Sequence, residues 1–167
     1  MVSVIRGDDN FDSSSVGGGS PSVFSIRDEK AAGVHGQYLP TATWNIREFQ
    51  TTDVNTLTGA SLAANVITLP EGTFDVEGLT KAYQSNKNKA RLYDITNSAT
   101  ILVSFNDSSG SSYGTGVDLH IIGRITVASG GITCRLEHSV QSTYFGGIYT
   151  NMTEPEIYSY IKFTEVT

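Results

Sequence analysis

VDLHIIGRITV, residues 117–127, is the stretch that most clearly indicates the fold class of this chain. Apolar Val117, Leu119, Ile121, Ile125 and Val127 alternate with polar Asp118, His120, Arg124 and Thr126. A period of two is typical of a β-strand that has one face against a core and the other exposed. Gly123 falls on the apolar face, where a glycine is typical of a bulge or of close approach by another backbone. The stretch therefore predicts a half-covered strand.

The following run, GITCRLEH (131–138), repeats this pattern and contains the single cysteine. Ile132, Cys134 and Leu136 alternate with polar residues, so the thiol belongs to the apolar face. A free cysteine is often buried, and no histidine or basic residue flanks this one on that face to activate it. We therefore expect Cys134 to be a packed core residue and not a nucleophile.

Strand-length runs of this kind occur along the chain after residue 22, separated by segments rich in the turn residues Gly, Pro, Asn, Asp and Ser. No run has convincing helical spacing over three turns, although SLAAN (61–65) is long enough for one. About nine such strands predict an all-β domain, an antiparallel two-sheet sandwich of jelly-roll or immunoglobulin-like topology. The runs are SVFSIRD, TATWNIREF, NVITL, TFDVEGL, ARLYDIT, TILVSF, VDLHIIGRITV, GITCRLEH and EIYSYIKFTEV.

The overall composition limits the classes of partner. The 167 residues include 11 Lys and Arg against 17 Asp and Glu, a net charge of −6. Such a chain lacks the clustered basic residues that bind nucleic-acid phosphates, so we expect no nucleic-acid partner. No apolar run approaches the roughly 18 residues of a membrane span, so we expect no membrane insertion. With one cysteine there is no intrachain disulfide, and stability has to come from packing or oligomerisation.

Catalytic and metal-binding patterns have no support in the sequence. His35, His120 and His138 are far apart, without another His or Cys at the short spacings of structural zinc sites. No serine stands in a G-x-S-x-G motif, and the glycines at 17–19 are not followed by the Lys-Ser/Thr of a phosphate-binding loop. We therefore expect no metal, no cofactor and no enzymatic activity. A glycan-degrading enzyme is an alternative, but the sequence offers no pair of acidic residues that can be assigned as its general acid and base.

Residues 1–22 differ in character from the rest. Val4, Ile5 and Phe11 are apolar residues on a polar segment, and VGGGSPS (16–22) has the composition of a flexible hinge. Apolar side chains without a core of their own are best explained if the segment becomes ordered on a partner. We therefore predict an N-terminal anchoring arm and hinge at 1–22 and a head domain at 23–167.

Two motifs within the arm carry little weight. Residues 6–8 read Arg-Gly-Asp, as in ligands of cell-adhesion receptors, but a given tripeptide of this kind occurs by chance in roughly 4 % of chains this long. The acidic spacing in DDNFD (8–12) is that of a calcium loop, but Ser13 and Gly19 occupy the positions of the diagnostic glycine and glutamate. We expect neither receptor adhesion through this tripeptide nor a resident calcium ion.

The last strand, EIYSYIKFTEV (156–166), carries apolar or aromatic residues on both faces. By alternation, one face holds Ile157, Ile161 and Phe163, and the other holds Tyr158, Tyr160 and Lys162. One sandwich covers only one face of a strand, so the tyrosine face is predicted to meet a neighbouring chain. A tyrosine pair half-exposed to solvent is the alternative.

Four segments carry a family resemblance. VITLPEGTFDVEG (66–78), KARLYDITNSATIL (89–102), GRITVASGGITCRLEHSV (123–140) and EIYSYIKF (156–163) follow one another as in globular heads of the tumour necrosis factor and complement type, in the version found in bacteriophage tail fibres and related virion proteins. The chain resembles these proteins over about 140 residues from Phe24 onward. It departs from them in GLTKAYQ (78–84), where phage relatives commonly carry an Ala-Pro-Ala-Tyr segment.

The resemblance implies a ten-stranded jelly roll assembled as a homotrimer about a three-fold axis. Tyr158 and Tyr160 are then the candidates for the trimer interface. His138, interpreted as lying opposite the apolar set of its strand, is the third candidate.

The resemblance also implies a non-enzymatic virion protein. We expect a trimeric tail-fibre head that docks to a tail or baseplate protein through its arm. We expect it to bind a host-surface glycan or protein through three long polar turns, SNKNKA (85–90), NDSSGSSYGTG (106–116) and TYFGGIYTNMTEP (143–155). Tyr113, Tyr144, Phe145 and Tyr149 are the candidate ligand-binding residues, because aromatic rings stack on sugars; the same turns could instead merely close the sandwich. The alternative function is a capsid decoration protein that binds three-fold sites of the phage head.

Overall fold

In the computed structural model, residues 20–41, 43–109, 116–150 and 152–166 are described. All regular structure in these residues is β, without a helix. The strands are β1 (Val23–Lys30), β2 (Tyr38–Leu39), β3 (Asn45–Ile46), β4 (Thr51–Asn55), β5 (Ser61–Ala63), β6 (Val66–Leu69), β7 (Gly72–Tyr83), β8 (Asn86–Asp94), β9 (Ala99–Val103), β10 (Asp107–Ser109), β11 (Gly116–Val127), β12 (Ile132–Val140), β13 (Tyr144–Phe145) and β14 (Glu156–Glu165).

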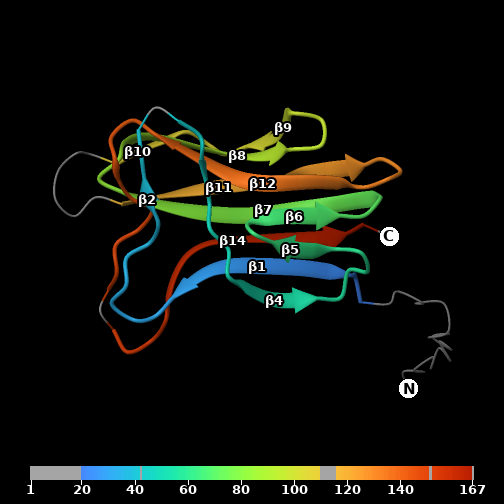
Figure 1. Cartoon of the computed structure of the whole chain (residues 1–167), viewed down its shortest axis with the longest axis horizontal. Coiled ribbons are helices and arrows are strands. Elements are labelled where there is room, and N and C mark those ends of the chain that lie inside the picture. Colours follow the sequence, from blue (N-terminus) through green and yellow to red (C-terminus); the bar gives the residue numbers. More distant parts are fainter. Residues whose placement is uncertain (1–19, 42, 110–115, 151, 167) are drawn as a thin grey trace, which may run out of the picture.

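The strands form two large antiparallel sheets. The five-stranded sheet has the order β11-β7-β14-β1-β4, so the first and last long strands are neighbours. The seven-stranded sheet has the path β10-β8-β12-β6-β5, with β3 added beside β12 and β9 beside β8. Strands β2 and β13 form a third, two-stranded sheet. The long strands run along the length of the molecule (Figure 1). The prediction of an all-β, antiparallel two-sheet sandwich is confirmed.

Strand β11 behaves as its sequence predicts. It pairs with β7 from Gly116 to Val127 without a register shift. Its predicted apolar face is buried and the polar residues between are exposed, as is Ile122. Gly123 faces inward, where an added Cβ would lie 2.7 Å from Cδ2 of Leu102 on β9. The close approach at this glycine is therefore made by a side chain, and β11 has no bulge there.

The core between the sheets is apolar over most of its length. Phe24 and Phe163 stack with ring centroids 6.3 Å apart, both completely buried. Cys134 is also completely buried, and burial together with the nearby Asp94 raises the pKa of its thiol to about 12. The prediction of a packed core thiol is confirmed.

The interior becomes polar towards the end where β1 finishes and β14 begins. Six polar or charged residues there have no exposed surface: Asp28, Arg47, Thr80, Ser85, His138 and Ser159. They come from both sheets. In the five-stranded sheet Asp28 pairs with Ser159, and Ser159 pairs with Thr80. His138 lies on β12 of the seven-stranded sheet. The interior of the sandwich at this end is therefore polar and charged, in contrast to the apolar core elsewhere.

The predicted faces of β14 are wrong at its start. The register of β1 against β14 shifts between Asp28 and Glu29, because Tyr158 is an extra residue without a partner in the ladder. A bulge of this kind changes the alternation of faces. Tyr158 is therefore only 2 % exposed, with its hydroxyl donating to the carbonyl of Val34 at 2.7 Å, whereas Ile157 is 46 % exposed.

The predicted face of His138 is also wrong. Strand β12 keeps its period of two from Cys134 to Val140, so His138 faces inward with Cys134 and Leu136. Both His138 and Tyr158 are covered by their own chain, which contradicts their placement on an exposed interface face. Tyr160 does lie on the outer face, where its hydroxyl donates to Glu77 at 3.0 Å. A homotrimer stays a prediction.

Candidate functional site

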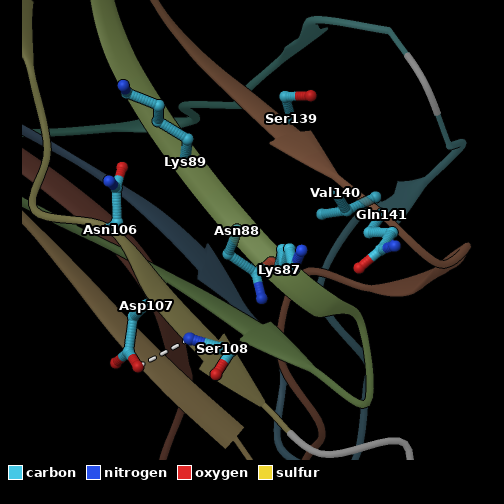
Figure 2. A pocket seen from close by; sticks show the side chains of 9 residues that line it. All are labelled: Lys87, Asn88, Lys89, Asn106, Asp107, Ser108, Ser139, Val140 and Gln141. Carbon is cyan, nitrogen blue, oxygen red and sulfur yellow. Dashed lines mark hydrogen bonds between the residues drawn. The ribbon is translucent and has the colours of Figure 1, made fainter.

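A groove of about 640 Å³ lies on the seven-stranded sheet at the polar end of the sandwich (Figure 2). We call it the polar groove. It brings together residues from β8, from β10 and the residue before it, and from the end of β12. Its lining residues are Lys87, Asn88, Lys89, Asn106, Asp107, Ser108, Ser139, Val140 and Gln141.

Backbone pairing positions these residues. Ser108 is opposite Lys87, and Ser139 is opposite Lys89. Beyond β12, the amide of Gln141 donates to the carbonyl of Lys87 at 2.9 Å. The tight turn that leads into β8 includes Asn86, which has a φ of +55°, and asparagine tolerates that conformation better than most residues. Two predicted ligand-binding turns, SNKNKA (85–90) and NDSSGSSYGTG (106–116), thus supply residues to one groove.

His138 lies directly beneath the polar groove. Its Nε2 donates to Oδ1 of Asn88 at 3.2 Å, and its Nδ1 is 3.4 Å from the hydroxyl of Thr80. Burial, reinforced by the positive charge of Arg47, holds the pKa of His138 well below its usual 6.5. The imidazole is therefore neutral near pH 7 and acts as a hydrogen-bonding brace under Asn88.

Acid should weaken the fold through His138. Below pH 6.5 the unfolded chain binds a proton that the folded chain refuses, so the free energy of unfolding falls as pH falls, by at most about 1.4 kcal/mol per pH unit from this group. Denaturant titrations of the wild-type chain and of His138→Gln between pH 7 and 5 measure this effect. We expect a shallower decline for the variant, and parallel curves would contradict the assignment.

A cluster of aromatic rings lies beside the polar groove and is centred on the β2–β13 pair. His35 and Phe145 stack in parallel at 4.3 Å, and Tyr149 tilts against His35 at 4.5 Å. The complete cluster, which we call the aromatic cluster, consists of His35, Tyr38, Tyr83, Tyr144, Phe145 and Tyr149. Two residues before Tyr144, the hydroxyl of Ser142 accepts at 2.6 Å from the side-chain amide of Asn86, which precedes the groove residue Lys87.

The predicted ligand-binding aromatics have different positions in this cluster. Tyr144 and Phe145 are half-buried and pack against other rings, so they support the cluster. Tyr149 is 38 % exposed and Tyr38 is 58 % exposed, which makes these two the rings that a ligand can reach. Sequence reasoning missed Tyr38, because AAGVHGQYL (31–39) lacks the alternation of a strand. Tyr113 and the arm residues Val4, Ile5 and Phe11 lie outside the described residues.

Three glycines let the chain close over a buried arginine under this cluster. Nη2 of Arg47 donates to the carbonyls of Gly146 at 3.2 Å and Tyr158 at 3.5 Å, and lies 3.9 Å from the Asp28 carboxylate. A Cβ on Gly146 would overlap Nη1 of Arg47, and one on Gly147 would overlap the ring of Tyr158. The third glycine is Gly36, whose amide donates a hydrogen bond to the carbonyl of Gly147 at 3.2 Å. We call Arg47 and Asp28 the buried ion pair.

Burial lowers the pKa of Arg47 to about 10, against the opposing effect of Asp28. Burial also raises the pKa of Asp28, although Arg47 and Lys30 act to lower it. The burial penalty therefore outweighs the mutual attraction of the two charges.

Within the described part of the chain there is no group of three or more His, Cys, Asp or Glu side chains placed to hold a metal ion. No helix in that part is long and apolar enough to cross a membrane.

Two solved structures show how this architecture compares with known folds. Murine APRIL, of the tumour necrosis factor family, superimposes with a TM-score of 0.60 at 8 % sequence identity, over 88 % of this chain and 100 % of that one. The globular domain of zebrafish complement 1qA protein gives 0.52 at 11 % identity, over 89 % and 98 %. The chain folds as a jelly roll. No protein-family model and no curated protein matches the sequence.

Proposed function

We propose that this chain is the trimeric head of a bacteriophage tail fibre, a non-enzymatic virion protein. Its N-terminal arm docks to a tail or baseplate protein, and the polar groove with the exposed rings beside it binds a host-surface glycan or protein. The virion-specific resemblance of the sequence supports this proposal, and the jelly-roll likeness agrees with a binding domain. In a trimer, three equivalent sites would raise avidity without a tight single contact.

One observation of the fold carries the proposal: the start of β1, which follows the arm in the sequence, and the polar groove are at opposite ends of the sandwich. β1 begins at Val23, which pairs with Thr164 near the end of β14, and the amide of Glu165 donates to the carbonyl of Ser22. In Figure 1 this end lies at the right, and β2 and β10 lie at the left. A head held by its arm would therefore present the polar groove away from its anchor, as attachment to a host requires.

Deletion of residues 1–20 tests the anchoring role. We expect the shortened chain to fold and to keep the oligomeric state of the full chain, because the described strands begin at Val23. It should no longer be incorporated into virions, as measured by immunoblotting of purified particles. Normal incorporation would contradict the arm as an anchor. Immunogold labelling of full-length chain on the capsid instead of the tail would replace the fibre function by capsid decoration.

Competition with virion adsorption tests the binding role. Excess purified full-length chain should lower adsorption of particles to host cells at least tenfold. Ser139→Trp would fill the polar groove and abolish competition, whereas Thr126→Trp, at an exposed position of β11 outside the groove, would leave it intact. Failure of the wild-type chain to compete would contradict the receptor-binding function.

A further inference from the structure

Lys87 and Lys89 differ from the other basic residues that the structure describes. The structure describes ten Lys and Arg residues, of which eight lie within 4 Å of a carboxylate oxygen; the other two are Lys87 and Lys89. The paired residues are Arg27, Lys30, Arg47, Lys81, Arg91, Arg124, Arg135 and Lys162. In a chain with a net charge of −6, two neighbouring lysines left without carboxylates mark a local excess of positive charge.

The acidic residues nearest to the polar groove are already engaged. Glu137, one strand position from the groove on β12, is bound by Arg91 at 2.6 Å and by Arg135 at 2.7 Å. In Figure 2 the carboxylate of Asp107 turns towards the backbone of Ser108, whose amide donates to it at 2.7 Å. Residues 110–115, which follow β10, contain no Asp or Glu in their sequence. The groove lining therefore carries the charges of two lysines against the single carboxylate of Asp107, and the net positive charge is available to a ligand.

The two lysines also share a face. They are two positions apart on β8, so their Cα atoms are about 7 Å apart and their side chains leave the same side of the sheet. Amide and hydroxyl groups surround them in the groove, from Asn106, Ser139 and Gln141. Sugar hydroxyls are good partners for such groups, and ammonium groups at this spacing can reach one anionic substituent or substituents on adjoining sugars.

We propose that the polar groove binds an anionic polysaccharide, with Lys87 and Lys89 contacting its carboxylate or phosphate groups and the amide and hydroxyl side chains contacting its sugar hydroxyls. The inference rests on the proposed function, since it names the class of host-surface ligand that the groove accepts. It requires no reaction and no cofactor, only charge complementarity in the groove.

Binding of purified full-length chain to immobilised polymers tests this directly. The probes are polygalacturonate, which carries carboxylates, a poly(glycerol phosphate) teichoic acid, which carries phosphates, and neutral dextran. We expect binding to one or both anionic polymers, no binding to dextran, and at least tenfold weaker binding at 300 mM than at 30 mM NaCl because salt screens exposed charges. The preferred polymer identifies the anionic group.

Two double variants separate the groove from overall charge. Lys87→Gln/Lys89→Gln should weaken binding at least tenfold, whereas Lys81→Gln/Lys162→Gln, which removes two ion-paired lysines from the other sheet, should change it less than twofold. Both variants have the same net charge, and circular dichroism checks that both fold. Equal losses in the two variants, undiminished binding by the groove variant, equal binding to dextran, or no binding to either anionic polymer would overturn the inference. The virion competition experiment tests attachment independently of these outcomes.

Discussion

Replacing Arg47 with methionine should lower the free energy of unfolding by about 3–5 kcal/mol, because removal of one member of a buried ion pair leaves the other charge buried without its partner. Asp28 has no exposed surface, and its remaining cation, Lys30, is 3.4 Å away. The arginine also ties Gly146 to Tyr158 through their carbonyls. Urea titrations followed by the fluorescence of Trp44, the single tryptophan, measure the loss.

The double variant Arg47→Met/Asp28→Leu is the matched control. Removing both charges should restore most of the stability, since apolar replacements of a buried pair are often neutral or stabilising. The single variant should also lose less stability at acidic pH, because protonation neutralises the carboxylate left behind. A single variant as stable as the wild type would show that the buried ion pair does not hold this end of the sandwich together.

Gly147→Ala should cost at least about 2 kcal/mol, from two sources that add. The residue has a φ of +128°, which a side chain adopts only with strain, and its Cβ would overlap the ring of the buried Tyr158. Because the β2–β13 pair carries the aromatic cluster, near-ultraviolet circular dichroism should lose tyrosine signal before global unfolding. Denaturant titration measures the stability change.

Gly130→Ala separates the two sources of this cost. Gly130 has a φ of +97° but no atom within 4 Å of the position of a Cβ, so its substitution carries the backbone strain alone. The difference between the two variants is then the cost of the overlap with Tyr158. Equal losses would contradict a tight closure of Gly147 over that ring.

The sequence predicted the parts of the fold that depend on local alternation. The faces of β11 and the buried thiol of Cys134 on β12 follow from a period of two that no bulge interrupts. TATWNIREF (41–49) was predicted as a full strand, but only Asn45 and Ile46 pair with β12. The chain there turns inward to bury Arg47, which depends on the room left by a glycine 99 residues later.

The site was less predictable, because it depends on contacts between distant segments. The bulge that turns Tyr158 inward lies opposite Asp28 and Glu29 and has no signal in the sequence of β14 itself. His138 lies on the apolar face of its strand and still contacts polar Thr80 and Asn88, which come from two other strands. Two of the predicted turns supply residues to the polar groove, whereas the absence of an ion pair at Lys87 and Lys89 becomes visible only in the three-dimensional structure.

The separation of the two ends of the sandwich has a mechanical consequence. A head anchored before Val23 and held at the polar groove would carry tension along the length of β1. This strand is hydrogen-bonded on both sides, to β14 and to β4. Because ladder hydrogen bonds lie across the strands, such tension would load many of them together in shear and not open them one after another. The topology therefore suits a domain that stays folded while it is pulled.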